Sequence, residues 1–216
     1  MQKRINYIGF LLMLLVVSCD SNPPKTDGCP EEVTIGKQVW MRSNLNVDKF
    51  RNGDPIPEAK TEGEWKSLAQ AGEPAWCNYD NEESNGRKYG KLYNWYAVND
   101  PRGLAPKGWH VFSDSDWMEL SDFLGGAEKA GAKMKSKTGW DNDGNGTNSS
   151  CFTGFPGGCR LSSGEFSAIG VDGYWWSSTG LNTDAAWFGY LDFVDGELNK
   201  VINTKGCGYS VRCLKD

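Results

Sequence analysis

Apolar residues in the first half of the chain recur in short runs that are separated by glycine-rich turns. Residues 33–35 and 38–41 are apolar runs on either side of Gly36-Lys37, a pattern that predicts a hairpin. Residues 64–71 predict a short helix whose apolar side chains share one face; these are Trp65, Leu68 and Ala69.

A second helix is predicted from Ser113, which is a good N-cap residue. The stripe at helical spacing consists of Trp117, Leu120, Phe123 and Leu124, and Gly125-Gly126 ends the helix. Asp114 and Asp116 fall in its first turn, where the positive end of the helix dipole favours carboxylates. Because capping accounts for both acids, we interpret them as structural and not as a catalytic pair.

Beyond residue 150 the pattern predicts short strands. Residues 185–194 place Trp187, Leu191 and Phe193 on one face, and Asp195-Gly196 predicts a tight two-residue hairpin before residues 197–202 return. Residues 208–214 predict a final strand. Two helices followed by antiparallel strands indicate an α+β fold.

The N-terminus has the pattern of an export signal. Lys3 and Arg4 precede an uncharged stretch, residues 8–17, that is too short to span a bilayer as a helix. A small residue, Ser18, then stands before Cys19, as in the lipobox of bacterial lipoproteins. We therefore expect residues 1–18 to be a signal peptide, Cys19 to carry the lipid, and residues 19–32 to be the lipidated N-terminus and a flexible linker.

The net charge of the chain limits the classes of binding partner that we expect. The formal net charge is −5 over 216 residues, and cleavage would remove Lys3 and Arg4. An acidic chain lacks the basic stripe that phosphate backbones require, so we expect no nucleic acid partner. The same charge offers no attraction to anionic headgroups, which leaves the lipid as the expected membrane attachment.

Seven cysteines are present, and lipidation of Cys19 leaves an even six: Cys29, Cys77, Cys151, Cys159, Cys207 and Cys213. An even number in an exported chain favours disulfides, with fifteen pairings open. The chain has no CxxC motif and one histidine, so we expect neither a structural zinc site nor a thioredoxin-like centre.

From residue 33 onward the chain resembles the Fibrobacter succinogenes major paralogous domain, a module of surface lipoproteins in Bacteroidetes-like bacteria. The resemblance is carried, in order, by residues 35–45 (IGKQVWMRSNL), 74–81 (PAWCNYDN), 89–98 (YGKLYNWYAV), 108–111 (GWHV), 130–135 (AGAKMK), 152–158 (FTGFPGG), 173–179 (GYWWSST) and 208–213 (GYSVRC). Phe112 stands where the family commonly has proline, and Cys151 and Cys159 look like additions.

The resemblance implies a disulfide-bonded, C-type-lectin-like domain over residues 33–216, distantly similar to the formylglycine-generating-enzyme domain. In such a fold Cys77 would pair with Cys213. We expect Cys151 and Cys159 to pair locally, which leaves Cys29 with Cys207, because the two chain ends meet in this fold.

Polar loops supply the candidate ligand residues. Asp141, Asp143 and Asn145 alternate before Gly146 like the first half of a calcium loop, but Phe152 stands where the twelfth-position acid belongs. We interpret the segment as a polar surface loop and predict no metal and no cofactor. The candidate ligand-binding residues are Asp141, Asp143, Asn145, Asn148 and Asn182.

Catalytic motifs are scarce. His110 is interpreted as a packed, hydrogen-bonded structural residue, and no GxSxG elbow, Walker loop or dinucleotide fingerprint is present. The aromatic runs 93–96 and 174–176 would suit stacking on sugars, but a domain with few aliphatic residues needs such rings in its core.

We therefore expect a non-enzymatic, lectin-like binding module for glycan or protein ligands, tethered by Cys19 to the outer membrane, where it can be exposed at the cell surface. Two alternatives stay open: an enzyme of the formylglycine-generating type, which requires a reactive cysteine pair, and a purely structural envelope protein.

Overall fold

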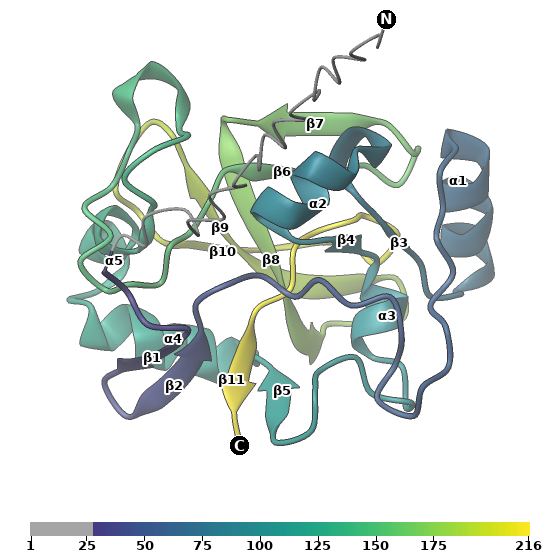
Figure 1. Cartoon of the computed structure of the whole chain (residues 1–216), viewed down its shortest axis with the longest axis horizontal. Helices are drawn as coiled ribbons and strands as arrows, with labels where there is room; N and C mark the ends of the chain where they lie inside the picture. The colour runs from purple at the N-terminus through teal and green to yellow at the C-terminus, as the bar shows by residue number, and fades with distance from the viewer. Residues whose placement is uncertain (1–27) are drawn as a thin grey trace, which may run out of the picture.

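The computed structural model describes residues 28–216 (Figure 1). The predicted signal peptide and Cys19 lie outside the described residues. The α-helices are α1 (Glu62–Ala71), α2 (Glu83–Tyr89), α3 (Trp95–Val98), α4 (Asp114–Phe123) and α5 (Ala127–Met134), with 3₁₀ turns η1 (Tyr79–Asn81) and η2 (Asp141–Asp143). Within the described chain no helix is both long and apolar enough to cross a bilayer.

The strands form three sheets. The first sheet has the order β1-β2-β11-β5 and consists of β1 (Glu32–Ile35), β2 (Gln38–Met41), β5 (Trp109–Val111) and β11 (Cys213–Lys215). The second has the order β10-β9-β8-β6-β7 and consists of β6 (Gly157–Arg160), β7 (Phe166–Ile169), β8 (Asp172–Gly180), β9 (Ala185–Asp192) and β10 (Asn199–Thr204). The third pairs β3 (Trp76–Cys77) with β4 (Leu92–Tyr93). All pairings are antiparallel except β6 with β8. The α+β prediction is confirmed.

The last strand lies inside the first sheet. Leu214 of β11 pairs with Trp40 on β2 and with His110 on β5. The N-terminal hairpin and the C-terminal strand therefore lie side by side, at the lower edge of the molecule in Figure 1.

Aromatic rings fill the core, as the composition predicts. One group surrounds Trp117, which stacks on Phe112 with ring centroids 4.7 Å apart and meets Phe152 edge-on at 6.0 Å. A second group surrounds Tyr209, stacked on Tyr174 at 5.0 Å. Phe112, the departure from the family pattern, is completely buried and so contributes directly to the first group.

Both predicted helices form, and each begins with a capping box. At α4, Ser113 Oγ accepts from the Asp116 amide and Asp116 Oδ2 accepts from the Ser113 amide. Thr61 and Glu64 do the same at α1. One stripe residue departs from the prediction: the Phe123 side chain is 62% exposed and covers the turn at Gly36, where a Cβ would lie 2.9 Å from its ring.

The predicted two-residue hairpin at Asp195-Gly196 is wrong, because β9 ends at Asp192 and β10 begins at Asn199. The intervening segment folds onto α5 instead. The buried Lys135 ammonium donates to the carbonyls of Asp192 (3.0 Å) and Asp195 (2.6 Å). The Gly196 carbonyl accepts from the Ala132 amide, and Leu198 is buried. These contacts favour a longer loop instead of a tight turn.

The predicted disulfide pairings are wrong. The structure joins Cys29 to Cys151, with a sequence separation of 122, while Cys77, Cys159, Cys207 and Cys213 are free and buried. The physical reason is the path of the residues before β1. They lie against the 148–153 loop, where Asn148 Nδ2 contacts Cys29 Sγ at 3.8 Å. Cys77 and Cys213 belong to separate apolar clusters, on β3 and β11.

The free thiols predict a stability loss at alkaline pH. Burial raises the pKa of Cys77, Cys159 and Cys213 to about 12, whereas thiols in the unfolded chain ionise near 9. Stability from a raised pKa is present below pH 9 and is lost as the pH rises toward 12, by about 1.4 kcal/mol per thiol and pH unit. Urea unfolding at pH 8.5 and 10 measures this. Cys77→Ala should reduce the difference between the two pH values, and an unchanged difference would contradict the prediction.

Candidate functional site

One hollow on the described surface has a volume of about 470 Å³ and a predominantly polar lining. Five separate segments form it. Its lining side chains are Lys66, Ala69 and Gln70 from α1, Tyr96 from α3, Ser162 and Ser163 from the β6–β7 turn, Asp184 from the β8–β9 loop, and Thr204 at the end of β10; Gly206 completes it. We call this hollow the α1 cleft.

Tyr96 is the aromatic residue of the cleft. Its neighbours Tyr93 and Trp95 are buried, whereas Tyr96 is half-buried. Asn94 orients the segment, because its Oδ1 accepts from the amides of Ala97 (3.1 Å) and Ala75 (3.0 Å). The run 93–96 thus contributes both to the core, as predicted, and to an accessible surface.

Lys205 positions the loop that carries Asp184. Its buried ammonium donates to the carbonyls of Asn182 (2.7 Å) and Thr183 (3.0 Å), and it lies 4.3 Å from the centroid of the Trp95 ring. The amide of Lys205 also donates to the carbonyl of Asp184 at 2.9 Å. Since these bonds use backbone oxygens, the Asp184 carboxylate is left to line the cleft.

The floor of the cleft is closely packed around Gly206. A Cβ there would lie 3.1 Å from Ala69 Cβ and 3.4 Å from Ser162 Cβ, so α1 and the β6–β7 turn approach each other closely over it. The Gly206 carbonyl accepts from the Trp65 indole at 2.9 Å. This contact ties the floor to the buried face of α1.

The lining offers donors and acceptors around one ring. Hydroxyls of Ser162 and Thr204, an amide of Gln70, an ammonium of Lys66 and the carboxylate of Asp184 share the hollow with Tyr96. Such a set can hydrogen-bond a ligand rich in hydroxyl groups while the ring contacts its apolar face. Glycoside hydrolysis in its usual form uses two carboxyl groups, and Asp184 is the single one in this lining.

The predicted 141–148 loop forms a different hollow, of about 350 Å³, to which Asp143 and Asn145 contribute together with Lys135 and residues 193–196. The Asn145 side-chain Oδ1 is used within the loop, accepting from the Trp140 amide at 3.1 Å. Asp141 is exposed and is not part of this lining. In residues 28–216 no group of three or more His, Cys, Asp and Glu side chains is arranged to hold a metal ion.

Asn148 belongs to the framework of its loop. It is 3% exposed, its Oδ1 accepts from the Thr153 amide at 2.8 Å, and its Nδ2 donates to Thr153 Oγ1 at 3.0 Å. Asn182 is exposed, but its Oδ1 accepts from the amides of Asp184 and Ala185, both at 2.9 Å. Both side chains therefore shape loops, and Asn182 borders the α1 cleft through its neighbour Asp184.

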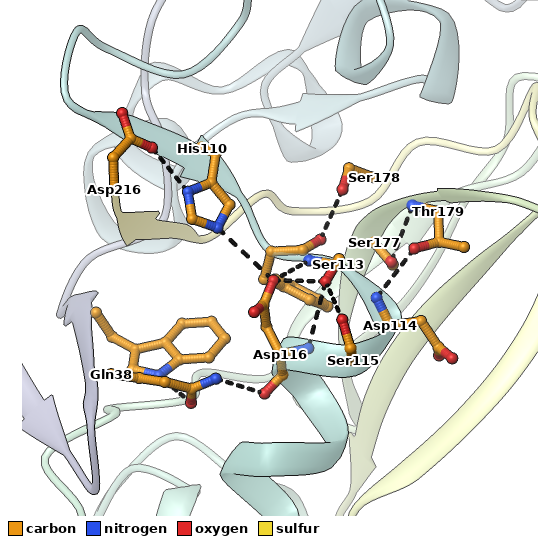
Figure 2. A network of polar contacts seen from close by, with 12 residues as sticks. Gln38, His110, Ser113, Asp114, Ser115, Asp116, Ser177, Ser178, Thr179 and Asp216 are labelled. Carbon is orange, nitrogen blue, oxygen red and sulfur yellow. Dashed lines mark hydrogen bonds and ion pairs between the residues drawn. The ribbon is translucent and has the colours of Figure 1, made fainter.

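His110 lies in a polar network at the start of α4 (Figure 2). Its Nδ1 is 2.8 Å from Asp216 Oδ1, and its Nε2 is 3.7 Å from Asp116 Oδ2. Ser113 Oγ donates to the same Asp116 oxygen at 2.6 Å. A serine nucleophile would need its hydroxyl against the imidazole. Here the hydroxyl meets the capping carboxylate, so the network ties the end of β11 to the α4 cap.

Residues 33–215 match the family model described as Fibrobacter succinogenes major domain. The chain belongs to this family. Neither the curated proteins nor the solved structures contain a match to the chain.

Residues from the quoted family motifs hold the framework of this Fibrobacter succinogenes major domain. Asn44 Oδ1 accepts from Arg212 Nε (2.9 Å), Arg212 Nη2 (2.6 Å) and the Trp175 indole (2.8 Å), which joins three motifs that are distant in sequence. The polar side chains of the α1 cleft lie outside the quoted motifs, and only Tyr96 lies inside one. Sequence reasoning missed the cleft, and its one signal was the aromatic run 93–96.

Proposed function

We propose that this protein is a non-catalytic, cell-envelope binding module that takes a glycan in the α1 cleft. The observation that carries the proposal is the lining: a half-buried Tyr96 ring surrounded by hydroxyl, amide, ammonium and carboxylate groups. Sugars present an apolar ring face and a rim of hydroxyls, so one aromatic ring with several short polar side chains is complementary to them.

The fold we propose for this module is C-type-lectin-like. Two features support it: the placement of β11 beside the N-terminal hairpin, and a second antiparallel sheet whose loops carry polar residues. Loops on a rigid scaffold are a common location for recognition. Asp184 lies on one such loop, which Lys205 holds in place, and residues 162–163 form another, which packs against Gly206.

Substitutions in the cleft test the proposal. The full chain in non-ionic detergent is screened on an array of neutral oligosaccharides, and the tightest one is titrated calorimetrically. Tyr96→Ala should weaken binding about tenfold because the sugar loses its ring contact, and Tyr96→Phe should retain it. Asp184→Asn should cost about tenfold or more, since hydrogen bonds to a carboxylate exceed those to an amide.

Asp122→Asn is the matched control, because Asp122 is exposed on α4 and lines another hollow. It should leave the affinity unchanged. An array with no binder would remove the support for a glycan. Capture of a specific protein whose binding depends on Tyr96 would redirect the same site to a protein ligand.

We further propose that the domain is tethered by a lipid on Cys19, at the outer membrane. The support is the junction of a basic start, a short apolar run and Ser18-Cys19. Cys19→Ser should release the protein from the membrane fraction, which immunoblotting of fractionated cells measures. Protease shaving of intact cells tests whether the domain faces outward.

The state of the free thiols gives little support to an enzyme of the formylglycine-generating type. Cys159 and Cys207 are both buried, and burial raises the pKa of each, which lowers the thiolate fraction that such chemistry needs. A free-thiol assay on the native protein separates the readings. Rapid reaction of a pair of thiols would favour the enzyme, whereas reaction only after unfolding would favour the binding module or a purely structural role.

A further inference from the structure

The chain enters the described domain at one end of its long axis. Figure 1 places the first described residues at the left, next to α5. Cys29 is held there by its disulfide to Cys151, and the amide of Ser150, beside that bond, donates to the carbonyl of Lys133 on α5 at 3.1 Å. β1 begins at Glu32 at the same end, so the entry point does not depend on the disulfide alone.

The α1 cleft lies at the opposite end of the domain. α1, which contributes three of the lining residues, stands at the right in Figure 1, and the β6–β7 turn lies on the same side. Neither α5 nor residues 141–151 contribute to the lining. Because the long axis is horizontal in this view, most of the length of the domain separates the cleft from the entry point.

The size of the domain determines how far the chain must run to bring the cleft against a membrane. For the described residues, 28–216, a compact fold has a radius of gyration of about 16 Å, which corresponds to a sphere of about 20 Å radius. If the cleft touched the membrane, the entry point would face away from it. The chain would then have to pass round the domain over a path of about 50 Å.

The chain between the proposed anchor and the entry point is too short for this path. Residues 20–28 separate Cys19 from Cys29. Even when fully extended, a segment of this length spans at most about 35 Å. This limit holds for every conformation of the segment. The domain can therefore lie on its side at the membrane, but the cleft cannot rest against the lipid headgroups.

We propose that the α1 cleft is presented away from the membrane that holds the anchor. It takes a polysaccharide chain that reaches it from beyond the headgroup layer, and not the sugar headgroup of a neighbouring lipid. The inference rests on the lipid tether and the glycan site proposed above. It adds the source of the glycan, because a headgroup sugar lies in a layer that Tyr96 and Asp184 cannot enter.

Energy transfer from single labelled sites tests this orientation. The lipidated full chain is placed in phosphatidylethanolamine–phosphatidylglycerol vesicles whose headgroups carry an acceptor dye that responds over short distances. A donor dye is attached at Gln70→Cys in the cleft or at Lys129→Cys on α5, and both positions are exposed. The unsubstituted chain measures background labelling of the buried thiols. Transfer from position 70 should be at most half of that from position 129.

A longer tether is the matched control. Twenty glycine and serine residues inserted between Asp27 and Gly28 extend its reach to about 100 Å, which exceeds the path round the domain. The twofold difference between the two labelled positions should then disappear. Equal transfer from both positions with the native tether, or a difference that the longer tether leaves unchanged, would overturn the inference.

The proposed function fails in a different way. If the lipidated chain did not associate with vesicles, the proposed tether and this inference would both be overturned. A glycan array with no binder would remove the glycan from the α1 cleft and with it the proposed source of the ligand. The energy-transfer difference would persist in that case, so the orientation is measured separately from the ligand.

Discussion

Replacing both Cys29 and Cys151 by serine is expected to lower the free energy of unfolding by about 5 kcal/mol. The bond closes a loop with a sequence separation of 122, and the chain-entropy model assigns about that value to a loop of this length. Cys29 is buried against the 148–153 loop, so the native state also loses a packing contact. Such a loss is a large fraction of the stability of a typical domain.

Urea unfolding of the oxidised wild type, the reduced wild type and the double variant measures the effect. The reduced wild type and the double variant should unfold at similar urea concentrations, both well below the oxidised protein. Cys77→Ser serves as the comparison, because it removes a buried thiol that is not bonded. A double variant as stable as the oxidised wild type would contradict the prediction.

Arg212→Met is expected to cost about 3–5 kcal/mol, because it removes donors from several buried acceptors at about 1–3 kcal/mol each. Arg212 is completely buried, and burial lowers the pKa of its guanidinium to about 9. Its donors reach neutral oxygens: Asn44 Oδ1, the Met41 carbonyl (3.1 Å) and the Phe152 carbonyl (2.6 Å). Methionine fills much of the volume but removes this donor from the Met41 and Phe152 carbonyls and leaves Asn44 Oδ1 with the Trp175 indole.

Two further variants distinguish the loss of the Arg212 hydrogen-bond network from the loss of a positive charge. Arg212→Lys keeps the charge but loses the planar fork, so it should remain strongly destabilised. Arg87→Met removes an arginine whose side chain is 70% exposed and should change stability by less than about 0.5 kcal/mol. The free energy of unfolding from urea titrations decides, and equal small losses in all three variants would contradict the role assigned to Arg212.

Local rules predicted the parts of the fold that local physics determines. The hairpin at Gly36-Lys37 and the cap at Ser113 depend on neighbouring residues, and both are confirmed. The same capping rule applied to Thr61 and Glu64 would have moved the start of α1 to Glu62. Helices α2, α3 and α5 were not predicted, because segments this short are unstable on their own and depend on packing against distant parts of the chain.

Features that depend on distant segments escaped prediction. Cysteine counting left fifteen pairings open, and the path of residues 28–32 decided between them. Asp195-Gly196 matches a tight turn, yet Lys135, directly after α5, donates to the carbonyls of Asp192 and Asp195. The α1 cleft draws on five segments, none of which carries a recognisable motif for it, and none of its lining residues was among the predicted ligand-binding residues.

The position of β11 also sets the order in which the domain can assemble. β2 and β5 are separated in their sheet by residues 213–215, so the N-terminal hairpin has no partner on that side until those residues are available. A chain still emerging from the ribosome therefore exposes an unfinished sheet edge. Because β11 inserts between β2 and β5, this sheet can be completed only after residues 213–215 have been synthesised.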